Sequence, residues 1–126
     1  MRLCKSPLVG RSVLIVDDHA AFRSAASALL EAEGFTVVGE AADGASALEA
    51  VRELRPDVVL LDVQLPDLNG FDVAAQLATE EETMPLIVFI SSRKASALRW
   101  RLAANPGWRF IAKSDLSGDA LATVLA

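Results

Sequence analysis

Five short apolar segments recur along the chain, and each is followed by a segment with helical spacing. The apolar segments cover residues 13–16, 36–39, 58–61, 86–90 and 110–112. Short apolar runs bounded by polar or turn residues are typical of strands that are buried on both faces. Strands that alternate with helices indicate a parallel sheet covered by helices on both sides. We therefore predict an α/β protein with an open, doubly wound parallel sheet.

Hydrophobic residues at helical spacing mark five helices after the strands. Pro56 ends the second helix, because proline cannot continue the helical hydrogen-bond pattern. An Asn-Pro-Gly turn at 105–107 ends the fourth helix, and Ser117 is the expected N-cap of the fifth. In chain order the spaced residues are Phe22, Ala26, Leu29 and Leu30; Ala47, Leu48, Val51 and Leu54; Val73, Ala74 and Leu77; Leu98 and Leu102; and Leu121, Val124 and Leu125.

The length of 126 residues fits one domain with a single core. We assign residues 1–11 to a flexible N-terminal leader and residues 12–126 to the folded domain. The single cysteine, Cys4, lies in the leader and excludes an internal disulfide. The apolar runs are too short to span a bilayer, and the first twelve residues lack the apolar core of a secretory signal. We expect a cytoplasmic protein without membrane contact.

The formal net charge of −5 argues against direct nucleic-acid binding, because contact with phosphates needs a cationic face. A local basic cluster does occur in the predicted fourth helix. We interpret this cluster as a solvated helix face. It comprises Arg93, Lys94, Arg99 and Arg101.

Polar side chains follow four of the predicted strands at the point where each strand ends. Asp17 and Asp18 follow the first strand, Asp62 the third, Ser91 the fourth and Lys113 the fifth. The carboxyl ends of parallel strands meet at one edge of the sheet, which is where open α/β sheets bind ligands. Surface charges placed at random would not gather in this way. The sequence therefore predicts one polar site at this edge.

Three carboxylates close together repel one another unless a proton or a cation relieves them. Oxygen ligands without a cluster of His or Cys indicate Mg²⁺, or Mn²⁺, rather than zinc. Lys113 and the Ser91 hydroxyl can then contact the oxygens of a phosphoryl group. An ionised Asp62 needs no general base to act as a nucleophile. The residue types predict a phosphoryl-transfer site.

Four sequence blocks carry a specific resemblance. They are VLIVDD at 13–18, DVQLPDLNG at 62–70, the hydroxyl residue Ser91, and FIAK at 110–113. In these blocks the chain resembles the receiver domains of bacterial two-component response regulators, from Val13 to about Leu125. The resemblance implies a flavodoxin-like fold with strand order 2-1-3-4-5 and five helices.

The resemblance also implies roles for single residues. Asp62 is the phosphoacceptor, which takes its phosphoryl group from the phosphohistidine of a sensor histidine kinase or from a small phosphodonor. Asp18 is a direct Mg²⁺ ligand and Asp17 acts mainly through water, while Asp62 and the backbone carbonyl of Gln64 complete the metal site. Lys113 and Ser91 assist the transfer. The domain is then a regulatory domain that promotes its own phosphorylation and dephosphorylation, not an enzyme with a separate substrate.

Phosphorylation in this family is coupled to shape through a hydroxyl and an aromatic residue, which correspond to Ser91 and Phe110. Simple core packing is an equally good reading of Phe110, whose ring has no hydroxyl, so a switch here must work by packing. The responding surface would comprise helix 4, strand 5 and helix 5, and would control an output, expected to be transcription. The segment KSDL at 113–116 resembles regulators with a C-terminal helix-turn-helix. Expected partners are a sensor kinase, the chain's own or a separate output domain, and a second copy bound through the same surface.

Three other functions stay open from the residues alone. A phosphatase with an aspartyl nucleophile would need a second acid where Gln64 stands. A nucleotide- or flavin-binding module would need a glycine-rich phosphate loop, and neither common form is present. A receiver-like module that is never phosphorylated would not need the whole set of site residues. His19, next to the acidic pair, is interpreted as a residue that faces solvent or supports the metal ligands.

Overall fold

The computed structural model describes residues 11–80, 85–92 and 108–125, which build a five-stranded parallel sheet. The strand order is β2-β1-β3-β4-β5, as predicted. Each strand extends the predicted apolar segment by one or two residues. The strands are β1 (Ser12–Val16), β2 (Thr36–Ala41), β3 (Val58–Asp62), β4 (Leu86–Ser91) and β5 (Arg109–Ala112).

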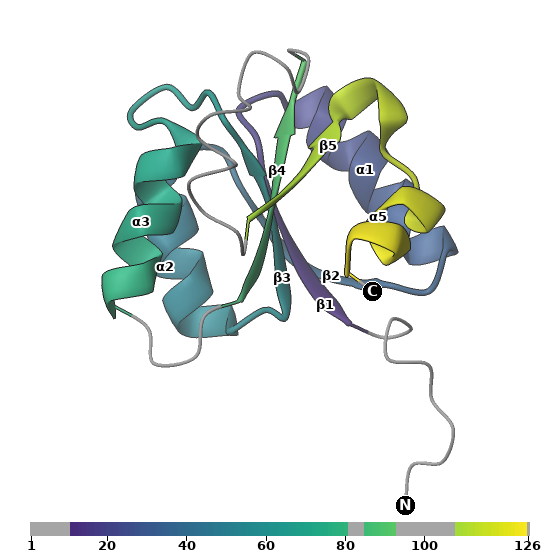
Figure 1. The fold of residues 1–126 in the computed structure, drawn as a ribbon, viewed down its shortest axis with the longest axis horizontal. Coiled ribbons are helices and arrows are strands. Elements are labelled where there is room, and N and C mark those ends of the chain that lie inside the picture. The colour runs from purple at the N-terminus through teal and green to yellow at the C-terminus, as the bar shows by residue number, and fades with distance from the viewer. Residues whose placement is uncertain (1–10, 81–84, 93–107, 126) are drawn as a thin grey trace, which may run out of the picture.

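Helices cover both faces of this sheet. In Figure 1, α2 (Gly44–Leu54) and α3 (Gly70–Glu80) lie on one side, and α1 (Ala20–Ala32) and α5 (Gly118–Leu125) lie on the other. A single 3-10 turn, η2 (Lys113–Asp115), follows β5. The predicted fourth helix lies outside the described residues, as do the basic cluster, Trp100 and residues 1–10 of the predicted leader.

Alternation along the strands divides the core into two layers. Leu14 and Leu61 pack in the layer beneath α2 and α3, whereas Ile15 and Leu60, one position along, pack in the layer beneath α1 and α5. All four side chains are fully buried. Because both faces are covered, the strands read as continuous apolar runs in the sequence, not as alternating ones.

Two of the predicted helix ends are confirmed, and the third, the turn at 105–107, lies outside the described residues. α2 ends at Leu54, and Arg55 adopts a left-handed conformation with φ 45° directly before Pro56. At the start of α5, the backbone N–H of Ala120 donates to the Ser117 hydroxyl at 2.9 Å. Leu29 and Leu54, which follow the helical spacing, are nonetheless exposed, because they lie at the margins of their apolar stripes.

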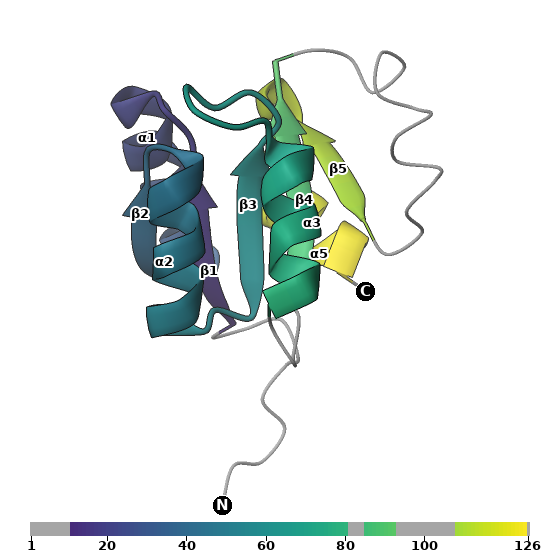
Figure 2. The same cartoon turned by 90° about the vertical axis from the view of Figure 1, so that its left-hand side faces the viewer.

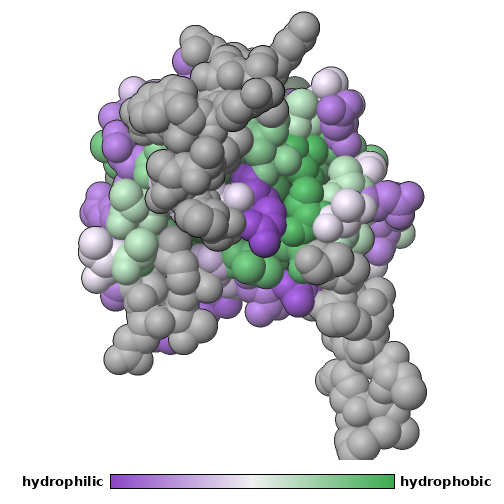
Figure 3. Space-filling view, in the orientation of Figure 1, coloured by the Kyte–Doolittle hydropathy of each residue, from purple (hydrophilic) through white to green (hydrophobic). Residues whose placement is uncertain are grey.

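Some hydrophobic residues near β5 and α5 lie at the surface of the molecule. Figure 3 shows hydrophobic residues gathered over β5 and toward α5 on the face seen in Figure 1. Leu116, Val124 and Leu125 are partly buried here against the layer beneath α1 and α5. Among the described residues, no helix is long and apolar enough to cross a membrane.

The parallel arrangement brings all five carboxyl ends to the same edge of the sheet. Figure 2 shows the strands running side by side, with the arrowheads and the loop that joins β3 to α3 at one end. The polar residues predicted to form a site follow these strand ends. The fold therefore places them within reach of one another.

Candidate phosphoryl-transfer site

Lys113 joins the ends of the first and third strands. Its Nζ lies 2.5 Å from Oδ2 of Asp17 and 3.2 Å from Oδ2 of Asp62. Its ammonium also lies 4.8 Å from the centre of the Phe22 ring, which limits the side chain from the α1 side. The Lys113 ammonium therefore bridges two buried carboxylates that lie 45 positions apart in the sequence.

Asp17 is held at the end of β1 by contacts from several directions. The side chain has no exposed surface, and its Oδ1 accepts the backbone N–H of His19 at 2.8 Å. The backbone of Asp17 donates to the carbonyl of Ala41 at 3.0 Å, and its carbonyl accepts from Arg23 at 2.6 Å. Arg23 is in turn paired with Glu40, 3.0 Å away. Asp17 is therefore fixed to β2 and α1 as well as to its own strand.

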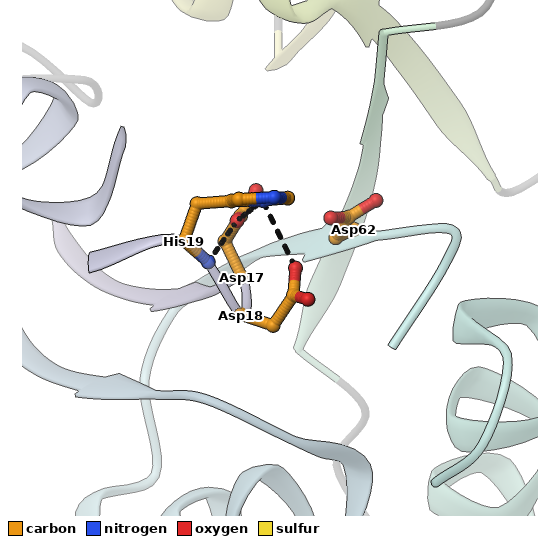
Figure 4. A group of neighbouring side chains, drawn as sticks. All are labelled: Asp17, Asp18, His19 and Asp62. Carbon is orange, nitrogen blue, oxygen red and sulfur yellow. Dashed lines mark hydrogen bonds and ion pairs between the residues drawn. The ribbon is translucent and has the colours of Figure 1, made fainter. Parts of the chain in front are cut away.

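Asp18 and His19 form the outer part of the site. Figure 4 shows the His19 ring beside the acidic pair, with Asp62 on the neighbouring strand. Nδ1 of His19 lies 3.1 Å from Oδ1 of Asp17 and 3.0 Å from Oδ1 of Asp18. The His19 side chain is 69% exposed and that of Asp18 is 37% exposed, so both face solvent, and the His19 ring connects Asp18 to the buried Asp17 carboxylate.

The charges of the site shift one another's pKa values. Burial raises the pKa of Asp62, and the neighbouring charge of Asp17 adds to this effect, so the net shift is upward although Gln64 and Lys113 oppose it. Burial also acts to raise the pKa of Asp17, but the Lys113 ammonium and the N–H of His19 outweigh it and hold that pKa below its ordinary value. Burial lowers the pKa of Lys113, but Asp17 and Asp62 more than compensate and raise it.

The loop after Asp62 is tightly connected to Asp62 itself. The backbone N–H of Gln64 donates to Oδ1 of Asp62 at 3.0 Å, and the N–H of Gly70 donates to the carbonyl of Val63 at 2.7 Å. A Cβ at position 70 would lie 2.3 Å from the carbonyl oxygen of Asp62, so only glycine fits there. The start of α3 therefore lies directly against the backbone of Asp62.

Ser91 and Phe110 lie on the neighbouring pair of strands. Ser91 ends β4, is buried, and pairs with Ala112 of β5. Phe110 pairs with Phe89 and is partly buried against the layer beneath α2 and α3. The two predicted switch residues thus stand two positions apart in strand register.

Trp108 belongs to an aromatic cluster just before Phe110. Its ring centre lies 5.0 Å from that of Phe89 and 5.5 Å from that of Phe71, and the two phenylalanine rings are 4.6 Å apart. Phe89 is two residues before Ser91 on β4. The indole therefore reports on the surroundings of the strand that carries Ser91.

The residues of this edge fit a hard divalent cation. One ligand atom from each of Asp17, Asp18, His19 and Asp62 lies within 4.8 Å of the others. Oδ2 of Asp17 is buried without a hydrogen bond of ordinary geometry, and its close contact is the ion pair with Lys113. Three carboxylates with one buried oxygen still able to accept are the ligand chemistry that Mg²⁺ and Mn²⁺ prefer.

Two polar residues at this edge were not singled out from the sequence. Arg23 holds the Asp17 carbonyl, and Asp67 accepts hydrogen bonds from the first residues of α2. Both act across strands or helices that are distant in sequence. Arg23 lies one helical turn beyond His19, but nothing local to Asp67 identifies its partner.

A comparison with known families decides the classification. The family model described as the response regulator receiver domain matches residues 13–124. The chain belongs to the response regulator receiver domain family. This confirms the family inferred from the sequence blocks, and receiver domains bind Mg²⁺ at an acidic pocket of this kind.

Individual relatives agree with this family. The receiver domain is 39% identical over 95 residues to BvgA of Bordetella pertussis, described as a transcription regulator of virulence factors. That alignment covers 75% of this chain and 44% of the relative. Among solved structures, the signal receiver domain of NarL from Mycobacterium tuberculosis is 31% identical, with a TM-score of 0.78, and the match covers 93% of this chain and 94% of that one.

A second solved structure is a two-component response regulator of the LuxR family from Aurantimonas, which is 26% identical with a TM-score of 0.79. The match covers 92% of this chain and 82% of that one. The receiver domain spans less than half the length of the BvgA relative. The fold and the family are therefore shared across the receiver domain, and the match to BvgA concerns less than half of that relative.

Proposed function

We propose that this receiver domain accepts a phosphoryl group on Asp62, with Mg²⁺ held at the adjacent acidic residues, and transmits its phosphorylation state to an output. The observation that carries the proposal is the Lys113 ammonium placed between Asp17 and Asp62. A buried acceptor beside a fixed cation and a second acidic group is the arrangement that phosphoryl transfer to a carboxylate requires.

In this proposal the transfer needs no proton to be removed from the acceptor. The ionised Asp62 oxygen forms a bond to phosphorus while the bond between phosphorus and the imidazole nitrogen of a histidine kinase, or the oxygen of a small phosphodonor, breaks. The leaving group keeps the electron pair and takes up a proton. Lys113 turns from the Asp62 carboxylate toward a phosphoryl oxygen, and the Ser91 hydroxyl donates to another.

Asp18 is assigned as the direct ligand of the cation, Asp17 as a ligand mainly through water, and Asp62 and the Gln64 carbonyl as the others. When bound, the cation neutralises charge that develops on the phosphoryl oxygens. Asp18→Ala is therefore expected to weaken Mg²⁺ binding more than any other change in the acidic pair. An unchanged Mg²⁺ affinity in a titration of this variant would remove Asp18 from the ligand set.

Transmission is assigned to Ser91 and Phe110. Movement of Ser91 toward the phosphoryl group frees space that Phe110 can fill, and the strand repacking reaches the aromatic cluster around Trp108. A ligand shifts a two-state equilibrium only through different contacts in the two states, which here are those of Lys113 and Ser91. We expect beryllofluoride with Mg²⁺, a mimic of the phosphoryl group, to change tryptophan fluorescence. Ser91→Ala should remove that change while leaving Mg²⁺ binding in place.

The proposed output is transcription, in line with the description of BvgA as a transcription regulator, and the proposed compartment is the cytoplasm. The proposed partners are a sensor histidine kinase and an output domain, in the same chain or separate. A second copy is a further proposed partner. The hydrophobic surface over β5 and toward α5 (Figure 3) could contact an output domain or a second copy.

Intact-mass measurement after incubation with acetyl phosphate and Mg²⁺ tests the central proposal. We expect the mass of one phosphoryl group to be added, to be lost on acid or hydroxylamine treatment, and to be absent when EDTA replaces Mg²⁺. A module that is never phosphorylated would gain no mass. A phosphatase would hydrolyse acetyl phosphate steadily without holding the phosphoryl group.

A further inference from the structure

Asp67 connects the loop after the acceptor strand to a helix elsewhere in the fold. Its Oδ1 accepts the backbone N–H of Gly44 at 2.7 Å, and its Oδ2 accepts the N–H of Ala45 at 3.0 Å. Gly44 and Ala45 are the first two residues of α2. Figure 2 shows the loop between β3 and α3 reaching across to the top of α2. The carboxylate thus satisfies two backbone donors that the helix cannot pair internally.

Packing around Gly44 gives a second, independent sign that the loop is seated on α2. A Cβ at position 44 would lie 2.8 Å from Cδ1 of Leu68 and 3.0 Å from its Cβ. Leu68 also packs against the layer beneath α2 and α3. The polar contact of Asp67 and the apolar contact of Leu68 therefore hold consecutive loop residues on the same helix end.

The other end of the loop is fixed at the acceptor. Gln64 pairs with Asn69 in a short antiparallel bridge, and its N–H donates to Oδ1 of Asp62. Gly70 closes the loop through its hydrogen bond to Val63. Between these fixed points Pro66 and Asp67 are exposed to solvent, and the Asp67 carboxylate attaches this part of the loop to α2.

α2 does not depend on Asp67 alone for its cap. Asp43, the N-cap residue, accepts the N–H of Ser46 at 2.8 Å and the Ser46 hydroxyl at 2.6 Å. The helix start therefore has its own local cap, and Asp67 adds an attachment to the loop. The two aspartates differ in one respect that matters, because only Asp67 belongs to the loop that carries Gln64.

We propose that Asp67 is a positioning residue for the phosphoryl-transfer site, acting by fixing the β3–α3 loop to α2 so that the backbone of Gln64 is held against Asp62 and the cation. This rests on the proposed function, since it concerns how firmly Mg²⁺ and the phosphoryl group are bound. Loss of the attachment lets the loop tip leave α2, and the Gln64 N–H and carbonyl lose their fixed direction.

The test compares Asp67→Ala with Asp43→Ala as a matched control on the same helix end. Both variants remove a carboxylate that accepts from the first turn of α2, so both should lower the melting temperature in EDTA by a few degrees. Only Asp67→Ala should raise the Kd for Mg²⁺, by about tenfold, the low end of what outer contacts contribute to metal affinity. Asp67→Asn keeps one acceptor oxygen and should recover part of the loss.

A spectroscopic measurement separates positioning from general loss of stability. The amide shift of Gln64 should move in Asp67→Ala without ligand and stay at its wild-type value in Asp43→Ala. Beryllofluoride affinity should follow the same pattern. If both variants changed Mg²⁺ affinity equally, or if neither did, the positioning role would be overturned. If Asp67→Ala failed to fold, the same comparison would be made with Asp67→Asn and Asp43→Asn.

Mg²⁺ and beryllofluoride binding by the wild-type protein distinguishes a failure of the proposed function from a failure of the role proposed for Asp67. A wild-type domain that bound neither Mg²⁺ nor beryllofluoride would contradict the proposed function itself. Normal binding by the wild type together with unchanged binding by Asp67→Ala would contradict the role of Asp67 alone.

Discussion

The two edges of the sheet use the same residue type in opposite ways. At the amino edge, Asp57 and Ser12 exchange hydrogen bonds: the N–H of Ser12 donates to Asp57 Oδ2 at 2.9 Å, and the N–H of Asp57 donates to the Ser12 hydroxyl at 2.8 Å. Asp57 is exposed, and its charge meets water as well as the backbone. At the carboxyl edge, Asp17 and Asp62 are buried and share one ammonium.

The aspartates at the two edges differ in how completely their charges are compensated by hydrogen bonds, ion pairs and water. Asp57 joins β1 to β3 through short, reciprocal hydrogen bonds with Ser12, and its exposed carboxylate is also solvated. Asp17 and Asp62 compete for Lys113, and their pKa values shift in opposite directions. Buried charge that is only partly compensated is costly unless a bound group compensates it. The amino edge therefore joins two strands, whereas the carboxyl edge holds partly compensated charge, which is what the proposed binding of a cation and a phosphoryl group would use.

The largest expected effect is on phosphorylation, which a substitution at the carboxyl edge should abolish and the same substitution at the amino edge should not change. Asp62→Asn should abolish acid-labile phosphorylation by acetyl phosphate, because an amide of nearly the same shape is a poor nucleophile. Asp57→Asn, the same change at the amino edge, should be labelled like the wild type. Intact-mass measurement reads both. Undiminished labelling of Asp62→Asn would remove the acceptor assignment.

Removal of the Lys113 ammonium, which Asp17 and Asp62 share, should have the largest effect on stability. Lys113→Met leaves Asp17 and Asp62 buried without their partner, and breaking such a buried pair costs about 3 kcal/mol, at the low end because Lys113 is partly exposed. Urea unfolding in EDTA measures this loss. Saturating Mg²⁺ should restore more stability to the variant than it adds to wild type. If Mg²⁺ raised the free energy of unfolding of both proteins equally, Mg²⁺ would not bind at the carboxylates that pair with Lys113.

A smaller effect is expected at the amino edge. Ser12→Ala removes the hydroxyl that accepts from Asp57 and should lower the free energy of unfolding by about 1 kcal/mol, the ordinary value of one hydrogen bond. The same urea titration measures it, and phosphorylation should continue at the wild-type rate. A slower rate would mean that the amino edge also influences the site.

The smallest expected effect is a dependence on pH in metal-free protein. The pKa of Asp62 in the folded protein lies above its ordinary value of 3.8, chiefly because of burial. Such a group contributes stability that is present below the unfolded pKa and is lost as the pH rises through the folded pKa. Asp62→Asn should therefore be more stable than wild type at neutral pH, with a difference that disappears as the pH falls toward 3.8. A constant difference across this window would contradict the raised pKa.

The sequence predicts the strands and the gathering of polar residues at one edge of the sheet well, for a physical reason, whereas the roles of these residues stay predictions. Strands buried on both faces must be apolar throughout, and the residues that follow them must lie at the carboxyl edge once the sheet is parallel. Asp17, Asp62, Ser91 and Lys113 were found in this way. The 3-10 turn after β5 was not expected, because one short turn has no periodic pattern.

Contacts between distant elements could not be predicted in the same way. Asp67 reaches α2 across 22 residues or more, and Arg23 reaches Glu40 across 17. Their partners are backbone groups or exposed side chains, which carry no sequence pattern. The exposure of Leu29 and Leu54 has a similar origin, since helical spacing identifies a stripe but not how far its neighbours cover it.

The strand order also has a consequence for the way the chain is made. β1, β2 and β3 are neighbours in the sheet and come first in the sequence, so the three acidic residues are synthesised and can be assembled before β5 exists. Lys113, whose ammonium pairs with Asp17 and Asp62, follows β5 and is made later. During translation the growing chain therefore holds like charges without their internal partner, at a stage when N-terminal parts already begin to fold.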